Sequence, residues 1–256
     1  MTDSKRIKKA ALIEFSEVSK SFLRHSGRML LRSHFKAILR RIPSERFYAL
    51  KDISFVVKQG ENVGIVGANG AGKSTLLSLA VGLSGPDKGR VTVVGTVAGL
   101  LELGSGFHPD LTGRENVFLN ASLLGLTKER TATIYENIVD FSEISDFIDQ
   151  PLRTYSTGMM LRLAFSVAVN VNPDFLIVDE VLAVGDQAFQ AKCFAKIAEL
   201  KSRGMSLLCV SHSPGVIEQL CERTLWLDHG ELVADGETRD VLKLYVGQAT
   251  LRRLSS

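Results

Sequence analysis

The eight residues from Gly67 to Ser74 (GANGAGKS) have the types and the spacing of a phosphate-binding loop, G-x-x-x-x-G-K-S. In such a loop, small residues let backbone N–H groups surround anionic oxygens at the positive end of the next helix. We expect Lys73 to reach the β- and γ-phosphates of a nucleotide, and the Ser74 hydroxyl to bind Mg²⁺. The residues predicted to bind the nucleotide here are Gly67, Ala68, Asn69, Gly70, Ala71, Gly72, Lys73, Ser74 and Thr75.

The segments on either side of this loop match the context that the motif requires. Residues 62–66 (NVGIV) read as a buried parallel strand, and residues 75–80 (TLLSLA) open a helix. A glycine-rich turn without a ligand is the alternative, and the strand before it and the helix after it disfavour that reading.

A second strand ends in two carboxylates. Residues 175–178 (FLIV) are wholly apolar and lead into Asp179 and Glu180. Ligands of open α/β sheets bind at such strand ends, so Asp179 is predicted to hold Mg²⁺ beside Ser74. Glu180 is predicted to polarise the attacking water in phosphoryl transfer. Without a phosphate loop in the same chain, the simpler interpretation would be two solvated carboxylates at the end of a strand.

A histidine follows a third apolar strand. Residues 206–210 (SLLCV) precede Ser211 and His212, which places His212 where it can reach a γ-phosphate from the side. The other four histidines, at positions 25, 34, 108 and 229, are interpreted as packing or surface residues.

The composition is that of an ordinary globular protein. The chain has 256 residues, of which 45% are hydrophobic and 23% charged, with no apolar run near the ~20 residues of a membrane helix. The apolar run after the basic N-terminus is too short for a signal-peptide core, so we expect a cytosolic protein. Three cysteines without C-x-x-C spacing indicate buried free thiols.

The pattern of elements predicts an α/β fold: a P-loop NTPase (RecA-like) core with a mostly parallel sheet. It also predicts an antiparallel N-terminal β part and a helical insertion subdomain. Residues 1–256 form one domain in this reading, with the core at about 11–103 and 170–236 and the helical subdomain at about 112–168. A helix is expected at 216–223 and a hairpin at 224–234. Residues 237–256 are a tail in which we expect no further domain.

The net charge of +3 is unevenly placed, with 14 lysines and arginines against 5 acidic residues in positions 1–60. Residues 24–46 resemble an insertion whose apolar and basic residues alternate as on an amphipathic helix, ended by Pro43. A membrane surface or an acidic partner would suit that helix, and docking on its own domain would suit it equally.

With these motifs in place, residues 11–236 resemble the ATP-binding-cassette (ABC) ATPases. Residues 155–159 (YSTGM) stand where that family has its signature L-S-G-G-Q, with only Ser156 and Gly158 retained. The resemblance implies that these two residues contact the γ-phosphate of an ATP held by a second copy of the chain. It also implies that residues 183–186 (AVGD) lie across a dimer interface.

Longer stretches point to a subgroup of the family. Residues 100–116, 155–165 and 178–189 are similar to the ATPase subunits of bacterial exporters of capsular polysaccharide, O-antigen or teichoic acid. The resemblance implies a homodimer, ATP and Mg²⁺ as cofactors, and a polytopic membrane permease as partner. It further implies a peripheral position on the cytoplasmic face of the inner membrane, with the polysaccharide contacted through the permease.

Two site assignments stay open. The family's glutamine at the entrance to the helical subdomain is missing, and Glu102 is the nearest polar substitute near the metal, although the register also allows Leu103. A solvent-facing or partner-facing role for Glu102 is equally compatible. An aromatic residue should stack on adenine, and Phe22 and Tyr48 are the candidates, with Tyr48 preferred.

Two other functions compete with transport. A soluble cassette protein acting on nucleic acid or the ribosome would suit the basic N-terminus, but such proteins usually carry two cassettes. A regulatory module without turnover is disfavoured because Lys73, Asp179, Glu180 and His212 are all retained. We therefore expect an ATPase without a nucleic-acid partner.

Overall fold

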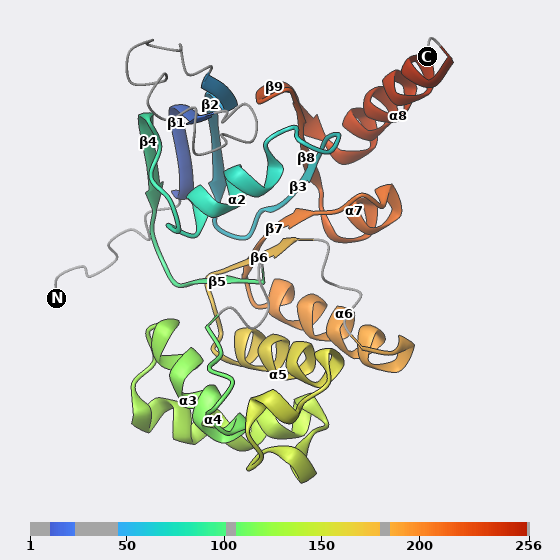
Figure 1. Cartoon of the computed structure of the whole chain (residues 1–256). Helices are drawn as coiled ribbons and strands as arrows, with labels where there is room; N and C mark the ends of the chain where they lie inside the picture. The colour runs from blue at the N-terminus through green and yellow to red at the C-terminus, as the bar shows by residue number, and fades with distance from the viewer. Residues whose placement is uncertain (1–10, 24–45, 101–105, 180–184, 255–256) are drawn as a thin grey trace, which may run out of the picture.

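The computed structural model describes residues 11–23, 46–100, 106–179 and 185–254, which form two sheets and a set of helices (Figure 1). The first sheet is antiparallel, with strand order β2-β1-β4. Its strands are β1 (Ala11–Leu23), β2 (Arg46–Lys58) and β4 (Lys88–Val93). This sheet is the predicted antiparallel N-terminal β part, and its first two strands are much longer than the sequence indicated.

The second sheet has six strands in the order β5-β6-β7-β3-β8-β9. Every neighbouring pair in it is parallel except β8 and β9, which form a hairpin. Its strands are β3 (Asn62–Val66), β5 (Val97–Gly99), β6 (Phe175–Asp179), β7 (Ser206–Val210), β8 (Arg223–Asp228) and β9 (Glu231–Glu237). The mostly parallel core sheet of the sequence prediction is confirmed.

Both faces of the parallel sheet are covered, which explains why its central strands are apolar without alternation. On one face, Phe175 and Ile177 of β6 join the core shared with helix α2 (Lys73–Ala80) and the antiparallel sheet. On the other face, Leu176 and Val178 join a core shared with the remaining helices. Successive side chains of a strand point to opposite faces, so one short strand serves both cores.

The predicted helical subdomain is a group of helices beyond the β5 edge of the sheet (Figure 1). Its first helix is stabilised by a capping box, in which Thr112 and Glu115 satisfy each other's backbone N–H groups. Its elements are α3 (Gly113–Leu123), α4 (Lys128–Ser142), two short 3₁₀ turns (Ser145–Phe147 and Leu152–Thr154) and α5 (Thr157–Asn170).

Three further helices complete the described chain: α6 (Gln187–Ser202), α7 (Pro214–Leu220) and α8 (Thr238–Leu254). The expected helix at 216–223 was misplaced, because Pro214 fixes a helical φ at the first position and Arg223 already belongs to β8. The tail at 237–256 contains α8, which the sequence analysis did not assign. The predicted helix within 24–46 lies almost wholly outside the described residues. No helix of the described chain is both long and apolar enough to cross a membrane.

Candidate functional site

The segment Gly67–Ser74 forms the connection from the buried strand β3 to helix α2, as the motif requires. Two of its glycines are needed for close packing. A Cβ on Gly67 would collide with the carbonyl oxygen of Leu227, and one on Gly72 with that of Ala49. Gly72 also has a φ of 107° as the N-cap of α2, a conformation that favours glycine.

The charged group of Lys73 is folded back onto this loop. Its side chain is buried, and Nζ donates hydrogen bonds to the carbonyl oxygens of Gly67 (2.8 Å) and Ala68 (3.0 Å). The carbonyl groups compensate part of the cost of burying the ammonium group. The side chain is thus held at the mouth of the loop, where the positive end of α2 also points.

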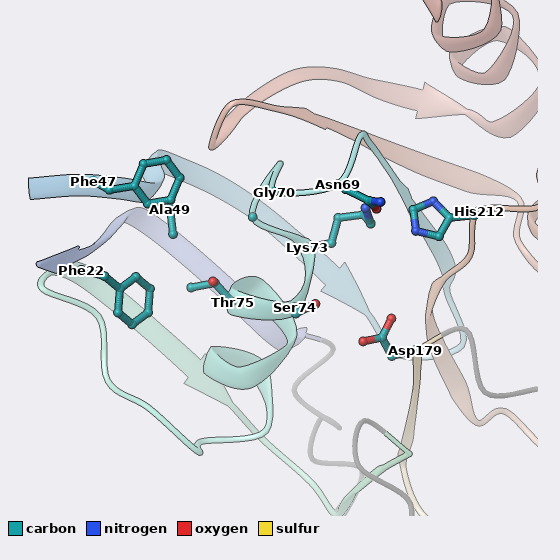
Figure 2. A pocket seen from close by; sticks show the side chains of 11 residues that line it. Phe22, Phe47, Ala49, Asn69, Gly70, Lys73, Ser74, Thr75, Asp179 and His212 are labelled. Atoms are coloured by element: carbon teal, nitrogen blue, oxygen red, sulfur yellow. The ribbon is translucent and has the colours of Figure 1, made fainter. Parts of the chain in front are cut away.

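A cavity of about 520 Å³ opens in front of the loop (Figure 2). The aromatic rings of Phe22 and Phe47 lie at one end, and Asp179 and His212 lie at the other, with the loop between them. The lining residues are Phe22, Phe47, Ala49, Asn69, Gly70, Gly72, Lys73, Ser74, Thr75, Asp179 and His212. Nine of these were predicted from the sequence; the remaining loop residues Gly67, Ala68 and Ala71 do not line the cavity.

The strand register brings Asp179 and His212 to the loop. Val210 of β7 pairs with Asp179 of β6 on one side and with Ile65 of β3 on the other. All three strands therefore end at the same edge of the sheet, and His212 follows β7 by two residues. Parallel strands that end together gather their following residues at one place, which is the general ligand site of such sheets.

The structure places a different aromatic residue in the cavity than the one preferred from the sequence. Phe47 lines the cavity together with Ala49, two positions along β2, whereas Tyr48 between them does not. Because strand side chains alternate between faces, Tyr48 points away from this face. Which face of β2 borders the cavity depends on its pairing with β1, so the sequence alone offered no signal for Phe47 over Tyr48.

The end of β1 that carries Phe22 is fixed by a polar cluster. Asp87 accepts hydrogen bonds from the backbone N–H and the hydroxyl of Ser21, both at 2.7 Å. These hydrogen bonds lower the pKa of the Asp87 carboxyl from its ordinary value. Lys20 adds a bond from Nζ to the carbonyl oxygen of Gly85 (2.7 Å). Phe22 is thereby held in place although half of its surface is exposed.

Two oxygen groups suited to Mg²⁺ face the same cavity. Ser74 supplies a hydroxyl and Asp179 a carboxylate. Mg²⁺ is commonly held by one or two protein oxygens together with substrate phosphates and water, so this donor set fits the ion. Within 11–23, 46–100, 106–179 and 185–254 there is no cluster of three or more acidic, histidine or cysteine residues that could hold a metal by itself.

Ser156 and Gly158 lie outside the cavity lining, at the start of α5. Ser156 is the N-cap, and its hydroxyl accepts a hydrogen bond from the backbone N–H of Met159 (3.2 Å). A Cβ on Gly158 would meet nothing nearer than the Ser156 hydroxyl at 3.8 Å, so the space in front of it is open. The N-terminus of α5 therefore lies outside the cavity that the chain's own phosphate loop lines, with open space in front of Gly158.

Tyr155 anchors the approach to this helix. Its hydroxyl donates a hydrogen bond to the carbonyl oxygen of Phe147 (2.7 Å), and burial raises the pKa of the phenol to about 12. The tyrosine therefore stays neutral and hydrogen-bonded across the physiological range. The remaining predicted site residues, Glu180 and Glu102, lie outside the described residues.

Comparison with known proteins agrees with this geometry. The sequence model described as "ABC transporter" matches residues 50–183. The chain is 53% identical over 199 residues to the ABC transporter protein AbcA of Aeromonas salmonicida, covering 78% of this chain and 65% of that protein. It is 48% identical over 238 residues to the O-antigen export system ATP-binding protein RfbB of Klebsiella pneumoniae, covering 91% and 97%.

The fold has close counterparts among solved structures. A bacterial ABC transporter cassette solved as a dimer matches with a TM-score of 0.71 at 22% identity, covering 89% of this chain and 99% of that one. At that identity the match shows a shared fold.

Proposed function

Because this chain belongs to the ABC transporter family of ATP-binding ATPases, we propose that it is the ATP-hydrolysing subunit of a polysaccharide exporter. One observation carries the proposal: a single cavity gathers the phosphate loop, Asp179, His212 and two aromatic rings from segments far apart in the chain. The export of an O-antigen-type glycan is supported by the near full-length similarity to a protein named for that role.

In this proposal the loop residues bind the phosphates of ATP. Backbone N–H groups at the start of α2 face the β-phosphate, and Lys73 moves from the loop carbonyls to the β- and γ-phosphates. Ser74 and Asp179 hold Mg²⁺, which neutralises charge on the phosphates. These residues orient the γ-phosphate for attack in line with the leaving oxygen.

Two residues act on the reacting end of the nucleotide. Glu180 follows Asp179 directly and orients the attacking water as a general base. His212 approaches the γ-phosphate from β7 and donates a hydrogen bond to it. At the opposite end of the cavity, Phe22 and Phe47 offer their rings to the adenine.

The active unit is a dimer with two shared sites. Ser156 and Gly158 do not line the cavity of their own chain, so they serve the nucleotide of a second copy. An arrangement with two-fold symmetry repeats the same contact twice and closes on two ATP molecules. Glu102 is proposed to lie near the metal or water at each site.

A membrane permease is the second partner, and it holds this chain at the cytoplasmic face of the membrane. The docking surface in this proposal lies at the end of α3, beside residues 106–111. Leu123 is 66% exposed there, and a Cβ on Gly106 would lie 3.0 Å from its Cδ1, whereas Phe107 packs partly into the core. An exposed leucine beside a glycine suits a short helix from a partner. The polysaccharide is contacted through the permease, and no nucleic acid is involved.

Reconstitution tests the proposal as a whole. The chain, co-purified with its permease in lipid vesicles, should hydrolyse MgATP and move glycan, and Lys73→Ala should abolish both. Hydrolysis without any glycan movement, when the permease is present and assembled, would limit the function to ATP turnover.

A further inference from the structure

The turn between β8 and β9 packs against the back of the phosphate-binding loop. Gly230 in this turn donates a hydrogen bond from its backbone N–H to the carbonyl oxygen of Ala71 (3.0 Å). Its own carbonyl oxygen accepts a hydrogen bond from the backbone N–H of Lys51 (2.7 Å). One residue thus connects the loop to β2, and Figure 2 shows the faint red hairpin lying beside the loop.

The approach is so close that a side chain has no room. Gly230 is buried with a φ of 80°, and a Cβ there would lie 2.8 Å from the carbonyl oxygen of Ala49. That same carbonyl group blocks a Cβ on Gly72, and the Leu227 carbonyl group of β8 blocks one on Gly67. Three stretches of backbone therefore meet with no side chain between them.

The contact bears on the orientation of the loop's peptide groups. A carbonyl oxygen held behind the loop fixes its peptide plane, so the N–H of the next residue points to the opposite side. For Ala71 that next residue is Gly72, the N-cap of α2, whose peptide borders the cavity. Anchoring one end of the plane therefore aims the other end at the phosphate position.

We propose that Gly230 is a positioning residue for ATP. The β8–β9 turn packs against the phosphate loop and holds the loop in the conformation that binds phosphate. The proposal rests on the nucleotide site proposed above. A side chain at position 230 would push the turn away from Ala49, weaken the bond to Ala71 and let the loop relax.

The chain offers a matched control in Gly60. Its φ is also 80°, but a Cβ there would meet nothing within 4 Å, so Gly60→Ala introduces the same backbone strain without the contact. Gly236→Ala is a second control within β9, where a Cβ makes an ordinary 3.7 Å contact with Val241. Gly230→Asn keeps the Cβ contact while tolerating the left-handed conformation better than alanine.

The experiment compares MgATP affinity, KM and kcat in these variants. We expect Gly230→Ala and Gly230→Asn to raise the Kd and KM for ATP about fivefold or more, because phosphate-binding groups are displaced. The kcat should fall less than about twofold, since Asp179 lies on another strand, β6. Affinities equal to that of Gly60→Ala, at comparable thermal stability, would overturn the proposal.

Hydrogen exchange on the unaltered chain gives a test that does not depend on the variants folding. MgATP should protect residues 228–232 together with residues 67–76, and Lys73→Ala should lose both effects. Protection of the loop with no change in the turn would contradict the proposal that the turn holds the loop in its binding conformation. If MgATP protected neither segment, the proposed nucleotide site would be wrong, and the inference about Gly230 would be wrong with it.

Discussion

Phe22 and Phe47 stand directly opposite each other on the paired strands β1 and β2, each with half of its surface exposed at the mouth of the cavity. Two exposed aromatic rings on neighbouring strands form an apolar surface that the flat ring of a ligand can cover. They lie at the end of the cavity away from Asp179 and His212, with the phosphate loop between the two ends (Figure 2).

The first prediction concerns adenine recognition. Phe22→Ala and Phe47→Ala should each weaken ATP binding by about 1 kcal/mol, which is roughly fivefold, through loss of ring stacking. Tyr48→Ala is the control on the neighbouring position and should bind ATP normally. Titration with a fluorescent ATP analogue measures all three. If Tyr48→Ala loses affinity while Phe47→Ala keeps it, the assignment of the ring is wrong.

The second prediction concerns the shared sites of the dimer. A mixed dimer of one Lys73→Ala chain and one Ser156→Arg chain keeps one shared site free of both lesions. Mixing the two inactive proteins in equal amounts should therefore restore about a quarter of the ATP-binding sites. Bound nucleotide in the isolated dimer fraction is the measurement. No recovery on mixing would mean that Ser156 serves its own chain's nucleotide.

The third prediction concerns the proposed permease surface. Leu123→Asp changes an exposed residue at the end of α3 and should leave folding and basal ATP hydrolysis intact. It should abolish co-purification with the permease, because a carboxylate replaces an apolar contact. Leu83→Asp is the matched control, being 70% exposed in the turn after α2. Equal recovery of permease with both variants would rule out this surface.

Phe107 is a poorer probe of the same surface. It packs partly against the large core, so Phe107→Asp should lower thermal stability as well as assembly. The exposed Leu123 separates the two effects.

The fourth prediction concerns acid sensitivity at the start of α6. The Asp186 side chain caps the helix by accepting a hydrogen bond from the backbone N–H of Phe189 (2.9 Å), and this bond lowers the pKa of its carboxyl. Arg162 of α5 adds an ion pair at 2.9 Å. A lowered folded-state pKa stabilises the protein above the ordinary pKa of about 4, and that contribution is lost as the pH falls below it.

Asp186→Asn removes the titrating group and keeps a good helix cap. Thermal melts should therefore show Asp186→Asn less stable than the wild type near pH 7, because the ion pair with Arg162 is lost. The difference should shrink below about pH 4, where the wild-type carboxyl becomes protonated. Asp146→Asn, at an exposed turn, serves as control. An unchanged acid profile in Asp186→Asn would mean that this carboxylate has no part in it.

Much of the fold could be predicted because local sequence patterns agreed with the helices and strands of the folded chain. The strand at 62–66 was located to the residue, since an apolar run before a phosphate loop has one interpretation. Helix α7 was expected at 216–223 but begins at Pro214, because proline at a first helical position favours the helix. The C-terminal helix α8 has too mixed a pattern to stand out from the sequence.

The site residues also fall into two groups, those predictable from local sequence and those that depend on tertiary contacts. The phosphate loop, Asp179 and His212 follow from motif and strand ends, which are local features. Phe47 and Gly230 could not be chosen from the sequence, because their roles depend on the register of β1 with β2 and on the packing of a distant hairpin. The Gly230 contacts join residues more than a hundred positions apart.

Phosphate release by the purified chain tests most directly whether this cavity hydrolyses ATP. The wild type should turn over MgATP, and Glu180→Gln should bind it with normal affinity but hydrolyse it about a hundredfold or more slowly, because the general base is lost. Lys73→Ala should fail earlier, at binding. Hydrolysis by Glu180→Gln at the wild-type rate would contradict the proposed site.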